Sequence, residues 1–117
     1  MSAPLVLNLL EGSVSFSFTP EAAKELQSTL HELMQRLKAK VAAASSGATG
    51  RPTPQKSVEY QYTGDVFLEI FCNPNIWATP FAAKVLITLR DDRIRLTTEA
   101  ELTRVVDDVS QYLDNVV

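Results

Sequence analysis

The sequence predicts an α+β fold, a two-layer sandwich in which an antiparallel sheet of about six strands carries two helices on one face. Two long segments repeat apolar residues at helical spacing, and three pairs of shorter segments are separated by turn residues. Their order is ββ-α-ββ-ββ-α. A length of 117 residues favours a single domain over residues 1–117, because two domains would each lie near the lower size limit for an independent core.

Residues 5–18 are expected to form a β-hairpin, because apolar and polar residues alternate on both sides of Glu11-Gly12. If that dipeptide is a two-residue turn, Leu9 faces Val14 and all the apolar side chains share one face of the hairpin. The residues of this face are Leu5, Leu7, Leu9, Val14, Phe16 and Phe18. The opposite face carries Asn8 and serines, which suit water.

A helix is predicted to start after Thr19, which is a suitable N-cap and is followed by Pro20 at the first helical position. Its apolar stripe consists of Leu26, Leu30, Leu33, Met34, Leu37, Val41 and Ala44. We expect the helix to end near Ala44. The following stretch, 45–57, is rich in Gly, Pro, Ser and Thr, and this composition predicts a mobile loop rather than a domain boundary.

The second half of the chain is predicted to hold strands near 58–63 and 66–72, then a hairpin of 84–90 with 93–97. A two-residue turn at Asp91-Asp92 would place Leu89 opposite Ile94.

The last segment of the chain is predicted to be a second amphipathic helix. Thr98 and Glu101 match a Thr-x-x-Glu capping box, which predicts that the helix starts there. Its apolar stripe is formed by Leu102, Val105, Val106, Val109, Tyr112, Leu113 and Val116. Asp107-Asp108 falls on the polar side, so we expect both carboxylates to be solvated.

One predicted strand is apolar on both faces. Phe67 and Phe71 alternate with Leu68 and Ile70 and therefore lie on the opposite side from them. Such a strand is normally covered on both faces. The helices can cover one face, and the other requires the segment 73–82 folded back, a ligand or a second subunit.

The segment 73–82 holds the single Trp and is stiffened by two prolines. Prolines lower the entropy cost of presenting side chains to a partner, so Ile76, Trp77 and Phe81 join Phe67 and Phe71 as a candidate interaction surface. The alternative is that Trp77 packs as a satellite of the core, which is the usual role of a buried aromatic side chain.

Three arginines are expected on the outer face of the last hairpin, namely Arg90, Arg93 and Arg95. Guanidinium groups bind carboxylates and phosphates, so the trio is a candidate anion site. Charged residues on edge strands also prevent aggregation, which is the competing explanation.

The residue counts argue against several kinds of chemistry. Cys72 and His31 are the single cysteine and histidine, which excludes an internal disulfide framework and a multi-histidine metal site. They fall on different elements, so we expect no catalytic Cys–His pair, no metal and no cofactor. A net charge of −3 disfavours nucleic-acid binding. The chain shows no targeting or transmembrane segment, so we expect no membrane contact and a cytoplasmic location.

The stretch NPNIWATPFAAKVLITLRDDRIRLTTEAELTRVV, residues 73–106, resembles short uncharacterised soluble proteins of cyanobacteria. It covers about a third of the chain. The resemblance implies a cytosolic setting in a photosynthetic bacterium and assigns no chemistry and no functional residue.

These observations favour a non-enzymatic interaction or regulatory module that is homodimeric or binds another protein. Its contacts would be the outer sheet face and the segment around Trp77. The alternative function is binding of a small anionic molecule in a pocket between segment 73–82 and the sheet, with Arg93 or Arg95 holding the anionic group. An enzyme would need polar groups that converge only in the folded chain.

Overall fold

The computed structural model describes residues 4–45 and 56–116, so the predicted loop 45–57 lies almost entirely outside the described residues. Strands and helices follow one another in the predicted order, ββ-α-ββ-ββ-α, and the α+β class is confirmed. The elements are β1 (Pro4–Asn8), β2 (Ser13–Ser17), α1 (Pro20–Ser45), β3 (Val58–Thr63), β4 (Phe67–Cys72), the 3-10 turn η1 (Pro74–Ile76), β5 (Lys84–Arg90), β6 (Arg95–Glu101) and α2 (Leu102–Val116).

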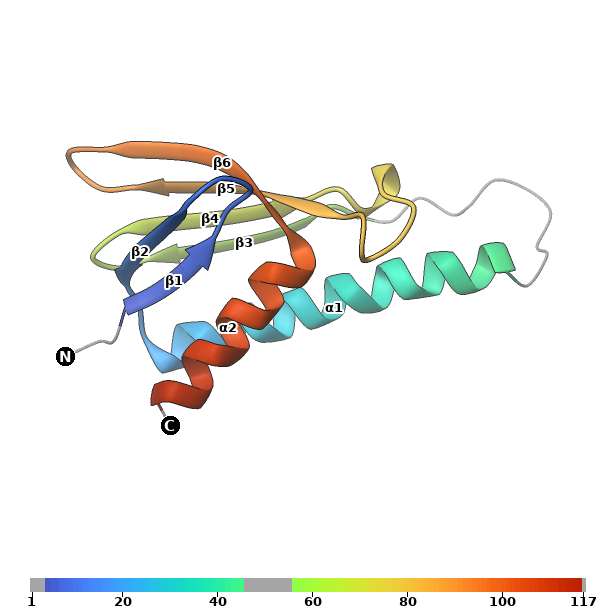
Figure 1. Cartoon of the computed structure of the whole chain (residues 1–117), viewed down its shortest axis with the longest axis horizontal. Helices are drawn as coiled ribbons and strands as arrows, with labels where there is room; N and C mark the ends of the chain where they lie inside the picture. The colour runs from blue at the N-terminus through green and yellow to red at the C-terminus, as the bar shows by residue number, and fades with distance from the viewer. Residues whose placement is uncertain (1–3, 46–55, 117) are drawn as a thin grey trace.

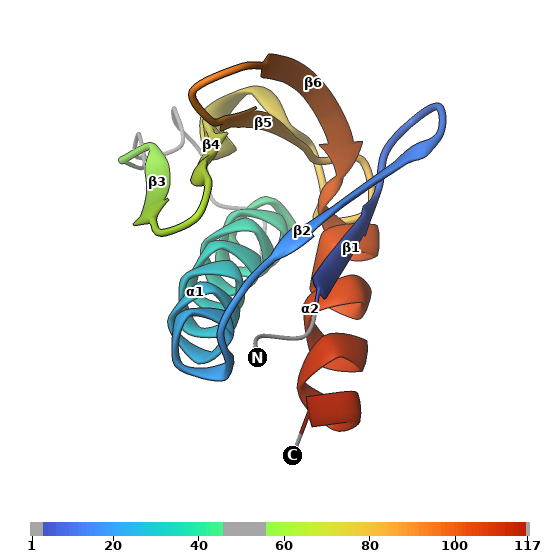
Figure 2. The same cartoon turned by 90° about the vertical axis from the view of Figure 1, so that its left-hand side faces the viewer.

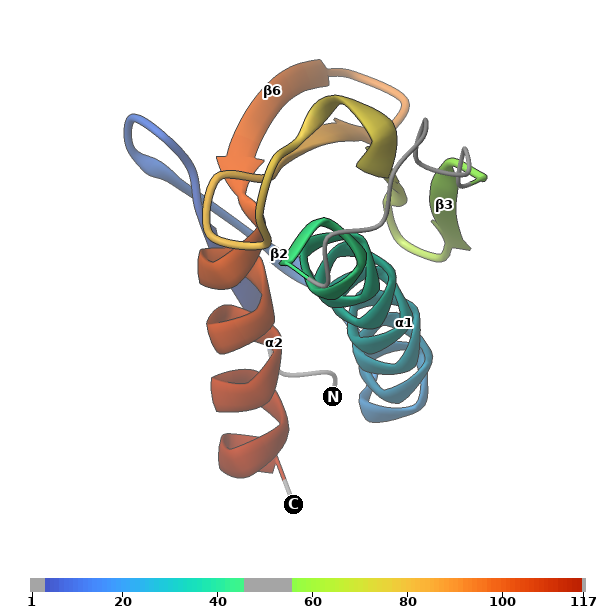
Figure 3. The same cartoon turned by 90° about the vertical axis from the view of Figure 1, so that its right-hand side faces the viewer.

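The six described strands form two antiparallel sheets, where the sequence led us to expect about six strands in one. One sheet is the β1–β2 hairpin, and the other has the order β3-β4-β5-β6. The four-stranded sheet curves over α1 (Figure 2), and α2 leaves the end of β6 and runs alongside α1 (Figure 3). The β1–β2 hairpin packs against α2, which gives it a cover of its own (Figure 1).

The turn of the first hairpin is longer than predicted. Leu7 pairs with Val14 and Leu5 with Phe16, so the connection is residues 9–12 and the N–H of Leu9 donates to the carbonyl of Gly12 (3.0 Å). A tight two-residue turn of type I′ needs positive φ at both central residues, and here only Gly12 has it, at 82°. The pairing is shifted by two residues, which preserves alternation, so the predicted apolar face is still the buried one.

The β5–β6 turn was also predicted too short. Leu89 pairs with Leu96 and Arg90 with Arg95, which leaves residues 91–94 as the turn. The carboxylate Oδ1 of Asp91 accepts hydrogen bonds from the N–H groups of Arg93 (2.8 Å) and Ile94 (2.9 Å), as Asp often does in turns. Ile94 therefore lies in the turn and is 63% exposed instead of facing Leu89.

The predicted start of the last helix is wrong. Residues 98–101 belong to β6, where Thr98 pairs with Ile87 and Glu101 with Lys84. Pairing with β5 satisfies backbone groups that a helix start at Thr98 would have left to its cap. The helix begins instead at Leu102, whose N–H donates to the carbonyl of Ala83 (3.0 Å).

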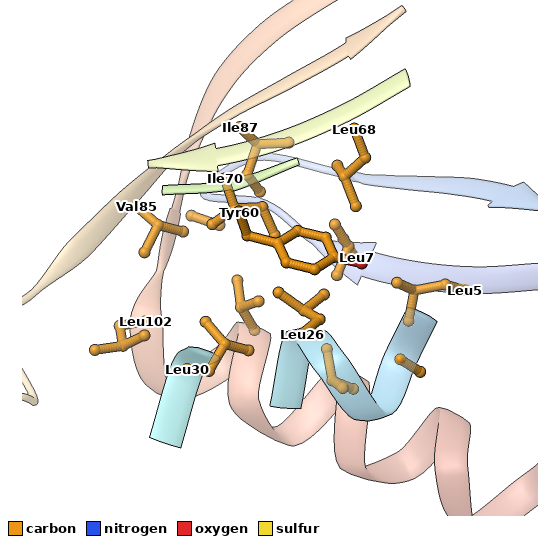
Figure 4. Packing of buried hydrophobic residues seen from close by; sticks show 14 of the residues in the cluster. Leu5, Leu7, Leu26, Leu30, Tyr60, Leu68, Ile70, Val85, Ile87 and Leu102 are labelled. Carbon is orange, nitrogen blue, oxygen red and sulfur yellow. The ribbon is translucent and has the colours of Figure 1, made fainter. Parts of the chain in front are cut away.

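The start of α1 confirms its prediction, because the Oγ1 of Thr19 accepts a hydrogen bond from the N–H of Ala22 (3.1 Å). Side chains of the sheets and both helices meet in one hydrophobic core (Figure 4). The largest fully buried side chains of this core are Phe18, Leu5, Leu7, Leu26, Leu30, Leu33, Leu37, Leu68, Ile87, Leu102, Val85 and Val105. The outer face of the four-stranded sheet points away from both helices, so neither helix covers it.

Candidate interaction surface

The two-sided character of β4 is present in the structure. Leu68, Ile70 and Cys72 are buried, while Phe67 and Phe71 are half-buried on the outer face. The strand pairing places Phe67 between Thr63 and Arg90, and Phe71 between Glu59 and Leu86. The two phenylalanines thus occupy different rows of the outer face.

Phe67 is covered by an arginine. The guanidinium carbon of Arg90 lies 4.5 Å from the centroid of the Phe67 ring, which is a cation–π distance. The segment 73–82 leaves the sheet at the other end of β4, and η1 contacts α1 on the helix side. Segment 73–82, one of the three covers expected for this face, therefore does not lie over Phe67.

Phe71 lies beside an apolar neighbour that the sequence reasoning missed. Leu86 pairs with Phe71 across β4 and β5 and is 41% exposed. The sequence could have indicated this neighbour, because alternation along β5 places Leu86 on the same face as Arg90, which is the outer face. Glu59 and Glu99 flank this pair in the same row.

The segment 73–82 is held in shape by local hydrogen bonds. The Oδ1 of Asn73 accepts from the backbone N–H (3.0 Å) and the side-chain amide (2.9 Å) of Asn75. At the other end, the N–H of Ala82 donates to the Oγ1 of Thr79 (3.1 Å). Pro74 and Pro80 are both buried, so both bends are anchored against the rest of the molecule.

The loop side chains named by the sequence separate into two groups. Phe81 is 80% exposed and Ile76 is 67% exposed. Trp77 is half-buried, packs against the core and is hydrogen-bonded to the Cys72 side chain, as the alternative for that residue held. We call Phe71, Ile76, Phe81 and Leu86 the loop-end surface, since all four lie at the end of the sheet where β4 passes into β5.

The three arginines lie at the opposite end of the sheet. Arg90 ends β5, Arg93 is in the turn and Arg95 begins β6. Loop 73–82 precedes β5, and a strand of this length spans about 20 Å. A single pocket that joins the loop to Arg93 or Arg95 is therefore not formed, and the two halves of the ligand-binding hypothesis separate.

Cys72 and His31 are placed in different environments. Burial raises the pKa of the Cys72 thiol to about 11, although the hydrogen bond with Trp77 acts in the lowering direction. His31 is exposed on α1, where its Nε2 lies 3.5 Å from the side-chain nitrogen of Gln35. Because its pKa is raised, the Cys72 thiol is a poor nucleophile at neutral pH.

Asp108 corrects the expectation of a solvated pair on α2. Asp107 is exposed, but Asp108 is buried and faces β1. Its two carboxylate oxygens accept hydrogen bonds from the backbone N–H and the side-chain amide of Asn8, each at 2.8 Å. No local pattern indicates this pairing, because the two residues are 100 positions apart in the chain.

A shallow groove between α1 and α2 was also not predicted. Its volume is about 460 Å³, and Leu30, Met34 and Val106 form its apolar part. His31 and Lys38 stand among its polar lining residues.

Neither helix of the described ranges combines the length and apolar character needed to cross a membrane. Within those ranges, no three His, Cys, Asp or Glu side chains gather as a metal-binding group. No protein-family model, no curated protein and no solved structure matches the chain.

Proposed function

We propose that the chain is a non-enzymatic interaction module that forms a homodimer through the loop-end surface. The observation that carries this proposal is the exposure of two large apolar side chains, Phe81 at 80% and Ile76 at 67%, on a loop whose bends are anchored. We further propose that it works in the cytoplasm, where a reduced thiol such as Cys72 persists.

The energetics support a binding role for these side chains. Burying a Phe or Ile side chain that is otherwise exposed contributes about 1.5–3 kcal/mol. Ordering a mobile loop would cost much of that gain, but this loop is already fixed by Asn73, Thr79 and the two buried prolines. Aromatic side chains such as Phe81 are enriched in protein interfaces, and a rigid one loses little entropy on binding.

A second copy of the chain is the partner we favour. The loop-end surface consists of two strongly exposed side chains on the loop, Ile76 and Phe81, and a less exposed apolar pair on the sheet, Phe71 and Leu86. In a two-fold dimer each surface patch meets its own copy, so the loop residues of one subunit can pack on the sheet pair of the other. Glu59 and Glu99 would then form a polar rim.

The test is the mass in solution, measured by light scattering on a sizing column. The wild-type chain should have about twice its 12.9 kDa mass, and Phe81→Ser and Ile76→Ser should shift it to the monomer. Ile94→Ser is the matched control, because Ile94 is 63% exposed but lies in the β5–β6 turn at the other end of the sheet. A monomeric wild type over the whole concentration range would refute the dimer.

A further inference from the structure

We propose that Arg90 and Arg95 form an oxyanion-binding site on the outer face of the sheet, suited to a phosphate or carboxylate group of a small solute. The two residues are direct partners across β5 and β6, so their side chains leave the same face from adjacent strands. This site is separate from the loop-end surface and does not depend on the proposed dimer.

Arg90 and Arg95 place two positive charges opposite each other on adjacent strands. Two cations that stand directly opposite on a sheet repel each other and destabilise the pairing. Neither Arg90 nor Arg95 forms an ion pair with a carboxylate of residues 4–45 or 56–116. An anion bound by both guanidinium groups would offset that repulsion with two charge-assisted contacts.

The nearby carboxylates of the described residues leave both arginines without an ion pair. The Oε2 of Glu69, in the next row of this face, accepts a hydrogen bond from the side-chain amide of Gln61 (2.9 Å). Asp91 accepts from the N–H groups of Arg93 and Ile94, and these bonds lower its pKa. Asp92, the other acid of the turn, makes no ion pair with either arginine.

One of the two arginines is already positioned. The guanidinium carbon of Arg90 lies 4.5 Å from the centroid of the Phe67 ring, on the β4 side of Arg90, while Arg95 flanks Arg90 on the β6 side. This contact restricts the Arg90 side chain and so lowers the rotamer entropy that it would lose on binding. Guanidinium groups present a planar fork of donors that matches the oxygens of phosphate and carboxylate. Arg93, in the adjoining turn, adds positive charge at the same end of the sheet.

The experiment is an NMR titration at constant ionic strength with two probes, inorganic pyrophosphate and citrate. We expect saturable shifts of the Arg90 and Arg95 side-chain Nε–H signals with at least one probe, and the stronger probe identifies the preferred group as phosphate or carboxylate. Arg95→Gln should weaken that binding by at least about tenfold, the loss of one charge-assisted hydrogen bond. Lys24→Gln, which removes an exposed charge on α1, should leave the affinity unchanged.

Three outcomes would overturn the proposal. They are the absence of saturation with both probes, equal shifts of all arginine signals, and an Arg95→Gln variant that binds as tightly as the wild type. Arg95 is exposed, so the variant is expected to fold, and its amide spectrum verifies this in the same experiment.

Discussion

At the scale of single residues, Tyr60 shows how a polar group is accommodated in this core. Its ring packs between the sheet and α1, and its hydroxyl donates to the carbonyl of Ala22 (3.1 Å) (Figure 4). Burial, together with the charge of Glu25 and the nearby Tyr62, raises the pKa of Tyr60 to about 12. The hydroxyl is therefore held in its neutral, donating form.

Tyr60→Phe should lower the free energy of unfolding by about 1 kcal/mol at pH 7, since it removes one buried hydrogen bond. Tyr60 holds its proton more tightly in the folded state than in the unfolded state, where its pKa is about 10. Its stabilising contribution is therefore complete below pH 10 and is lost as the pH rises through 12.

Urea unfolding at pH 7, 9 and 11 measures both effects, and the wild type should lose more stability than Tyr60→Phe between pH 9 and 11. Tyr62→Phe is the control, because Tyr62 is only half-buried. Parallel losses in the wild type and Tyr60→Phe would contradict the assignment of this pH dependence to Tyr60.

Cys72 should be chemically inert in the folded protein. The thiol is buried with a pKa of about 11, so little thiolate is present at pH 8. An aromatic disulfide reagent at pH 8 is expected to label it slowly in buffer and completely in urea. Rapid stoichiometric labelling without urea would show that the thiol is accessible and activated.

At the scale of elements, the pair Asn8–Asp108 ties β1 to α2. The described β1–β2 hairpin does not join the four-stranded sheet, so its position depends on contacts with α2. Two hydrogen bonds to a buried carboxylate require a defined geometry, so they orient β1 on α2 more specifically than apolar packing does.

Asp108→Ala should lower the free energy of unfolding by about 2–3 kcal/mol, because it leaves the two donors of Asn8 without an acceptor. Asp107→Ala removes the same charge one residue away from an exposed position and should change stability by less than about 0.5 kcal/mol. Chemical denaturation of the two variants gives the comparison. Equal effects would mean that net charge, and not the Asn8 contact, is responsible.

Elements were predictable to the extent that their cause is local. The cap of α1 at Thr19 and the buried side of the first hairpin follow from short-range chemistry and alternation, and both are confirmed. The pattern at Thr98 and Glu101 was equally local, but pairing with β5 overrode it. Register depended on turn geometry, which the positive φ of Gly12 and the side chain of Asp91 influence in ways that alternation does not show.

At the scale of the whole molecule, the division of the strands into two sheets was out of reach of the sequence. Nothing in the pattern of residues 5–18 tells whether that hairpin adds to the larger sheet or packs on a helix, since both bury the same face. The candidate surfaces were found residue by residue, but their separation to opposite ends of β5 appeared only with the fold. Distances between elements of different hairpins are not encoded in periodicity.

The homodimer through the loop-end surface is tested most directly by an isotope-filtered NOE experiment on a mixture of ¹³C-labelled and unlabelled chains. Such an experiment detects only contacts between two copies. We predict intermolecular NOEs that link the Ile76 methyl groups or the Phe81 ring of one chain to the Leu86 methyl groups of the other. Intermolecular NOEs confined to other exposed apolar residues, namely Val6, Leu10 and Ile94, or their complete absence at millimolar concentration, would contradict it.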